Sequence, residues 1–180
     1  METLDVIKSR KSVREYLDKP IEESKLEQLV DIANIAPSAG PIHISVVTNT
    51  ELLDKIKADT IEGMKKSGMD FLVKSASVEG FDPIHGAPAV MFISSPKDSP
   101  FGIHTAACSA TTVILAALDM GLGTCYAAST IFAFAVDPSL AKELGIPDGF
   151  APVCSVYIGY PTKPIEKRND EHKDNITICK

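Results

Sequence analysis

This chain of 180 residues lacks several patterns that would assign it to a functional class at once. Its four cysteines are widely spaced and include no C-x-x-C pair, so they predict neither a zinc site nor a disulfide framework. The four histidines show no ligand-like spacing either, and we expect no metal. The chain has fewer basic than acidic residues. Its formal net charge of -6 argues against a nucleic-acid or membrane-surface partner.

Long uninterrupted hydrophobic runs are also missing. The most apolar region, Ile103 to Leu122, is interrupted by His104, Asp119 and several hydroxyl side chains, which favours a buried core helix over a membrane span. No signal peptide opens the sequence, so we expect a cytoplasmic protein. With 44% hydrophobic and 23% charged residues, the composition is ordinary for one soluble globular domain.

The elements expected along the chain do not alternate regularly. Apolar spacing, caps and β-branched runs predict helices over 4–7, 24–36, 51–66, 103–120 and 137–145, and strands over 44–48, 89–94 and 153–158. Ser24 and Glu27 fit a capping box at the start of the second helix, and Pro37 ends it. The stretch 67–86 has no clear period and is expected to be irregular, as functional lids often are. Because helices outnumber strands, the predicted class is α+β.

The helix expected over 103–120 carries small residues on almost every face, namely Ala106, Ala107, Ser109, Ala110, Ala116 and Ala117. A helix that is apolar all round is buried all round. In a domain of this size, that composition indicates that a partner subunit covers one side.

The segment G-L-G-T-C-Y (121–126) that follows admits two interpretations. It is either a helix C-cap and turn, or backbone that approaches a flat ligand closely. It lacks the third glycine of a dinucleotide fingerprint and follows a helix instead of a strand, which argues against a Rossmann site.

The clearest functional signal is a basic cluster at the start of an acidic chain. Five cations surround the hydroxyl of Ser12: Lys8, Arg10, Lys11, Arg14 and Lys19. Guanidinium groups, a hydroxyl and backbone N–H groups near a helix terminus are the donors that a phosphate needs. The alternative is a solvated basic face. We take a bound phosphomonoester as the leading hypothesis.

Four segments taken together resemble the nitroreductase family of FMN-dependent oxidoreductases. They are I-K-S-R-K-S-V-R-E-Y (7–16), A-P-S-A-G (36–40), G-L-G-T-C-Y (121–126) and L-G-I-P-D-G-F-A-P-V with Y-I-G-Y-P (144–161), in the family's order. The resemblance implies a central, mostly antiparallel sheet flanked by helices, and an intertwined homodimer with FMN bound at the interface. It also implies a single domain over 1–180, in which 160–180 is a C-terminal extension packing on the partner subunit.

The resemblance further implies which residues bind the cofactor. The FMN phosphate and ribityl chain would be held by Arg10, Lys11, Ser12 and Arg14, joined from the C-terminal tail by Arg168. The partner subunit would contribute Pro37, Ser38, Ala39 and Gly40, with His43 standing where the family commonly has a glutamine. The isoalloxazine ring would lie beside the backbone of Tyr126, Ala127, Ala128 and Ser129.

The implied activity is the transfer of a hydride from NADH or NADPH, followed by two-electron reduction of a nitroaromatic, quinone or similar electron-poor small molecule. Such a ping-pong reaction uses the chemistry of the cofactor, so we expect no catalytic side chain. Pro41 and His43 replace the family's usual asparagine and glutamine. That departure motivates an alternative, an FMN-binding protein with a specialised or non-enzymatic role: a sensor, a carrier, or a dehalogenating or flavin-degrading relative. A phosphate-binding module without redox activity is a further alternative.

Overall fold

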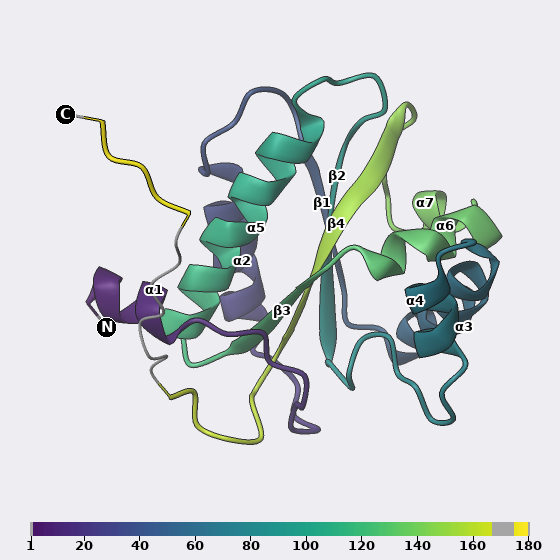
Figure 1. The fold of residues 1–180 in the computed structure, drawn as a ribbon, viewed down its shortest axis with the longest axis horizontal. Coiled ribbons are helices and arrows are strands. Elements are labelled where there is room, and N and C mark those ends of the chain that lie inside the picture. Colours follow the sequence, from purple (N-terminus) through teal and green to yellow (C-terminus); the bar gives the residue numbers. More distant parts are fainter. Residues whose placement is uncertain (1, 167–174, 180) are drawn as a thin grey trace.

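A four-stranded sheet forms the centre of the computed structural model, which describes residues 2–166 and 175–179 (Figure 1). The elements follow in the order α1 (Thr3–Ser9), α2 (Glu23–Asn34), β1 (His43–Val47), α3 (Thr50–Lys66), α4 (Asp70–Ala76), β2 (Ala89–Pro96), α5 (Gly102–Asp119), β3 (Gly123–Ala127), the 3-10 helix η1 (Ser129–Phe132), α6 (Ala133–Val136), α7 (Leu140–Glu143) and β4 (Phe150–Gly159). The strand order is β1-β2-β4-β3, and every pairing is antiparallel. The predicted α+β class is therefore confirmed.

Helices cover both faces of the sheet (Figure 1). Alternate residues of β2 point to opposite faces: Met91 and Ile93 pack with α2 and α5, whereas Val90 and Phe92 pack with α3, α6 and α7. Because β2 is a central strand between two apolar layers, its sequence is a continuous hydrophobic run instead of an alternating one. β1 and β3 are the two edges of the sheet.

α5 is the core helix that the sequence predicts. Its buried residues Ala106, Ala110, Val113 and Ala117 pack against the sheet. Within the described residues, α5 is the one helix long and apolar enough to cross a membrane. Its opposite face is not covered by this chain: Ile103 is 69% exposed there. The single chain thus buries one side of the helix, and cover for the other side by a partner subunit stays a prediction.

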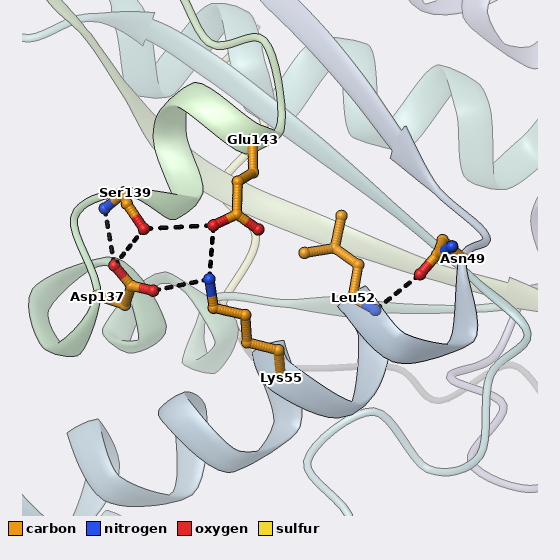
Figure 2. Close-up of polar contacts among 6 residues, drawn as sticks. All are labelled: Asn49, Leu52, Lys55, Asp137, Ser139 and Glu143. Carbon is orange, nitrogen blue, oxygen red and sulfur yellow. Dashed lines mark hydrogen bonds and ion pairs between the residues drawn. The ribbon is translucent and has the colours of Figure 1, made fainter.

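A polar cluster fixes α3 to the segment that precedes β4 (Figure 2). Lys55 Nζ lies 2.9 Å from Asp137 Oδ2 and 2.5 Å from Glu143 Oε1. The backbone N–H of Ser139 donates to Asp137 Oδ1 at 2.8 Å. At the start of α3, Asn49 accepts a hydrogen bond from the backbone N–H of Leu52, which caps the helix.

Two local predictions are wrong. The capping box of Ser24 and Glu27 does not form, because α2 begins at Glu23 with Glu22 as its N-cap, so Ser24 already lies in the first turn. The stretch 67–86 is not irregular throughout: it contains α4, whose Leu72 and Ala76 pack against Met64. Its two turns are too short for a helical period to stand out in the sequence.

The chain after α5 also differs from expectation. Gly121, with φ +79°, ends α5 in the turn that one of the two interpretations predicts, and the Leu122 N–H donates to the Ala117 carbonyl at 2.8 Å. From Gly123 onward the segment is strand β3, and η1 with α6 occupies a stretch for which the sequence predicts no element. The helix expected over 137–145 is the four-residue α7, which ends as predicted at Gly145 with φ +67°. Asp137 and Pro138 form a turn ahead of it, in which the Asp137 side chain accepts from Ser139.

Candidate functional site

The basic segment after α1 lies along the start of β3. Ser12 forms a parallel bridge with Thr124, and the Val13 N–H donates to the Thr124 carbonyl at 2.8 Å. The approach is close enough to require a glycine next to it: a Cβ on Gly123 would lie 2.8 Å from Val13 Cγ2. Two of the predicted site segments, 10–14 and 126–129, are thereby brought together by tertiary structure.

The start of the C-terminal extension lies beside the same segment. The Leu17 N–H donates to the Tyr160 carbonyl at 2.8 Å, and the Thr162 N–H donates to the Glu15 carbonyl at 3.3 Å. Tyr160 is itself held by Lys25, whose Nζ lies 2.9 Å from the Tyr160 Oη. The two chain ends therefore form adjacent walls of one hollow.

That hollow has a volume of about 220 Å³, and its charged lining residues are three cations and one carboxylate, Glu15. Lys11, Ser12 and Arg14 form one wall, and residues 161–165 form the other. Lys163 contributes a cation that no sequence pattern indicates, and its Nζ lies 3.4 Å from Glu15 Oε2. Arg168, which was predicted for this role, lies outside the described residues. Arg10 is half-buried as the C-cap of α1 and does not line the hollow.

The outer edge of β3 offers backbone groups to a ligand. The Thr124 carbonyl points away from β4, because it accepts from Val13. In an antiparallel strand this orientation repeats at every second residue, so the N–H and C=O of Tyr126 also point away from β4. Tyr126 lies about 7 Å further along the strand than Thr124. Its side chain is 46% exposed, and burial of the remainder, with a smaller effect of Cys154, raises the pKa of its phenol to about 12.

A layer of hydroxyl and phenol groups supports this edge from the α3 side of the sheet. The hydroxyls of Ser129 and Tyr157 lie 3.4 Å apart, and those of Thr130 and Ser155 lie 2.7 Å apart. Tyr157 is only 1% exposed, and burial raises its pKa. Tyr16 donates to the Val13 carbonyl at 2.8 Å. The segment that begins at Ser129 is therefore held firmly in place.

His85 joins this layer from a distant part of the sequence. Its ring makes an edge contact with Tyr157, with centroids 6.1 Å apart and planes at 66°. Burial lowers the pKa of His85, and the positive charge of Arg14 lowers it further. The sequence carried no signal for this residue, because neither its neighbours nor its spacing forms a motif.

The other residues predicted to bind the cofactor, the 37–40 loop and His43, lie away from Arg14 and Tyr126 in the fold. The Ala39 N–H donates to Thr105 Oγ1 at 3.0 Å, which fixes the 37–40 loop at the first turn of α5. β3 begins just after the other end of that helix, which has 18 residues and is about 27 Å long. His43 lies on β1, at the opposite edge of the sheet from β3 (Figure 1). One chain alone does not bring these residues to Arg14 and Tyr126.

The donor set fits a phosphorylated ligand with a flat polar ring. Lys11, Arg14 and the hydroxyl of Ser12 are groups of the kind that donate charge-assisted hydrogen bonds to a phosphate. The outward N–H and C=O of Tyr126 match the donors and acceptors at the edge of a heteroaromatic ring. Fold and site together define an α+β protein whose sheet edge is suited to such a ligand.

Comparison with similar proteins shows to which family this α+β protein belongs. The sequence pattern of the nitroreductase family matches residues 7–160, and the chain belongs to that family. A protein of Archaeoglobus fulgidus named as an NADH dehydrogenase/NAD(P)H nitroreductase is 30% identical over 173 residues, which are 89% of this chain and 86% of that protein. A protein of the same name from Methanothermobacter thermautotrophicus is 29% identical over 184 residues, covering 100% of this chain and 88% of the relative.

Solved structures agree with the fold. A nitroreductase from Desulfitobacterium hafniense with bound FMN has a TM-score of 0.87 and 26% identity, covering 100% of this chain and 99% of the other. A nitroreductase from Bacteroides fragilis with bound FMN has a TM-score of 0.88 and 24% identity, with both chains fully covered. The family and the antiparallel fold that the sequence predicted are thereby confirmed.

Proposed function

We propose that the protein is an FMN-dependent oxidoreductase that accepts a hydride from NADH or NADPH. In this proposal it then reduces an electron-poor small molecule, such as a nitroaromatic or a quinone, by two electrons in ping-pong order. The observation that carries the proposal is the juxtaposition of the Lys11–Arg14 cations with the open edge of β3. Membership of the nitroreductase family supports it.

The chain's own residues would bind and orient the cofactor. Lys11, Ser12 and Arg14, with Lys163 across the hollow, are placed to hold the phosphate. The backbone of Tyr126 and the residues that follow would lie beside the ring, where N–H groups stabilise negative charge. Bound FMN would supply the hydride chemistry, so the protein needs no acid or base for that step.

The proposed enzyme is a homodimer, and the positions of the predicted residues support this. The 37–40 loop and His43 cannot reach Tyr126 within one chain, so a second copy would have to supply them. The face of α5 that carries exposed Ile103 is available for that contact. In the C-terminal extension, Ile176 and Ile178 are 69% and 77% exposed, which fits packing on the partner subunit. Light scattering coupled to size-exclusion chromatography would test the dimer, and a monomer that binds FMN normally would contradict it.

The decisive experiment is an anaerobic absorbance titration. The purified protein is mixed with FMN, freed of excess, and then treated with NADH or NADPH followed by a nitroaromatic or a quinone. Bleaching of the flavin bands by the nicotinamide and their return on adding the acceptor would support the proposal. Bands that persist would favour the specialised FMN-binding protein that Pro41 and His43 suggest. A protein that takes up no flavin would overturn the proposal and leave the phosphate-binding module.

A further inference from the structure

Tyr16 joins the basic segment to the end of β4. Its phenol O–H donates to the Val13 carbonyl at 2.8 Å. Its ring lies directly on the backbone of Gly159, because a Cβ at that position would come within 2.7 Å of Tyr16 Cδ1. Burial raises the pKa of Tyr16, so the phenol keeps the proton that it donates. The hydrogen-bond donor therefore has a fixed place in the fold, set by β4.

The residue that accepts this hydrogen bond lies between two residues of the proposed phosphate site. Ser12 precedes Val13 and Arg14 follows it, and both line the hollow. The N–H of Val13 donates to the Thr124 carbonyl at 2.8 Å. Both backbone groups of Val13 are thus bound, one by β3 and the other by the phenol. These two contacts fix the course of the backbone between Ser12 and Arg14.

The orientation of the Val13 carbonyl also sets that of the Arg14 N–H. The two groups belong to one planar peptide unit, and no peptide bond among the described residues is cis, so the N–H points away from the phenol. Because the phenol is largely buried, the N–H faces outward, where Arg14 is exposed and lines the hollow. Within the described part of the chain, this N–H donates to no backbone carbonyl. A hydrogen bond accepted by the carbonyl polarises the peptide unit and makes its N–H a stronger donor.

We propose that Tyr16 is a positioning residue of the phosphate site: by binding the Val13 carbonyl, it orients the Arg14 N–H to donate a hydrogen bond to the phosphate of FMN. The inference rests on the proposed function, because it requires that FMN bind with its phosphate beside Arg14. This N–H adds a donor of fixed direction to the site. The long side chains of Lys11 and Arg14, in contrast, lose rotamer freedom when they bind an anion.

The ring and the hydroxyl of Tyr16 have separate effects. The ring packs on Gly159 and supports the fold, whereas the hydroxyl orients the peptide unit between Val13 and Arg14. Tyr16→Phe keeps the ring and removes the hydroxyl. The Val13 carbonyl then loses its donor, and the peptide unit is free to turn. The variant therefore tests the orienting role with the packing retained.

The test compares FMN with riboflavin, which has the same ring and ribityl chain but no phosphate. Quenching of flavin fluorescence measures the affinity of the wild type and of Tyr16→Phe for each flavin, and urea unfolding checks the fold of the variant. We expect Tyr16→Phe to bind FMN about three- to tenfold more weakly, the contribution of one hydrogen bond, and to bind riboflavin as the wild type does. A merely structural role would weaken both flavins equally. Equal losses, or no loss for either flavin, would overturn the role of Tyr16 and leave the proposed function standing.

A second measurement uses the wild type alone and does not depend on the folding of a variant. The amide resonance of Arg14 is followed by ¹H–¹⁵N NMR in the protein bound to FMN and in the protein bound to riboflavin. A hydrogen bond to the phosphate should move the amide proton downfield with FMN and not with riboflavin. The same position with both flavins would overturn the proposed hydrogen bond. Failure of the wild type to take up FMN would overturn both this inference and the proposed function.

Discussion

Two groups of charged residues, one around Lys55 and one in the basic segment around Ser12, differ in whether carboxylates pair with their cations. Around Lys55, the cation is matched within the cluster by the carboxylates of Asp137 and Glu143 (Figure 2). In the basic segment, the described part of the chain offers no carboxylate in an ion pair with Arg10, Lys11 or Arg14. The carboxylates around Lys55 tie two elements together, whereas Arg10, Lys11 and Arg14 have no ion pair among the described residues and can take an anion from outside.

The two groups of charges also differ in where they lie in the fold. The Lys55 cluster joins α3 to the region of α7 at the protein surface, where exposed ion pairs contribute little to stability. The basic segment lies against an open sheet edge and a hollow lined by a further lysine, Lys163, which pairs with Glu15 at 3.4 Å. Like charges that crowd together repel one another until an anion offsets them.

The largest expected effect comes from removing Arg14, a cation that has no ion pair among the described residues. Arg14→Gln should weaken FMN binding by about ten- to a hundredfold, since a hydrogen bond to a charged group contributes roughly 1.5–3 kcal/mol. Lys55→Gln is the matched control and should leave the affinity unchanged. Quenching of flavin fluorescence measures both. Equal losses in the two variants would show that the clusters do not differ in function.

A smaller effect is expected where the basic segment meets β3. In Gly123→Ala the new methyl group would crowd Val13, because it would lie 2.8 Å from Val13 Cγ2. Crowding of this kind costs about 1–3 kcal/mol, and the displaced segment should also bind FMN more weakly. Chemical denaturation and flavin titration measure the two losses.

The rescue variant for that change is Val13→Ala combined with Gly123→Ala. Removing two methyl groups from position 13 restores space for the methyl group at 123. The double variant should therefore recover affinity relative to Gly123→Ala alone. If both variants bind FMN as the wild type does, docking of the segment on β3 is not what positions the cations.

The smallest effect is expected in the matched cluster. Hydrogen bonds from Ser139, and then Lys55, lower the pKa of Asp137 from 3.8 to about 2. The native state thus binds this proton less tightly than the unfolded chain, so the stabilisation is present above pH 4 and is lost as the pH falls toward 2. Urea unfolding at several pH values should show a small gap between wild type and Asp137→Asn that closes over this interval. A gap that stays constant down to pH 2 would contradict the assignment.

Sequence patterns over a few residues predicted some elements of the fold correctly. These are the elements in which the burial of each residue follows from its neighbours in sequence. The apolar run 89–94, the small-residue helix and the interleaved cations around Ser12 all had this character, and the structure contains strand β2, helix α5 and the basic segment there. β3 was not predicted because it follows directly on the helix stop at Gly121, and its partner residues on β4 are about thirty residues away in sequence. Lys163 and His85 were missed because a lone lysine and a lone histidine have no pattern at all.

The sequence by itself determined the family, the α+β class and the excess of positive charge beside Ser12, because these depend on composition and short-range spacing. Only the tertiary structure decided that Lys55 is matched by carboxylates, since Asp137 and Glu143 reach it from more than eighty residues away. It also decided that Ser12 lies on Thr124 and that His85 faces Tyr157. Contacts of this range follow from how the helices and the sheet pack around a common core, and no window of sequence contains that information.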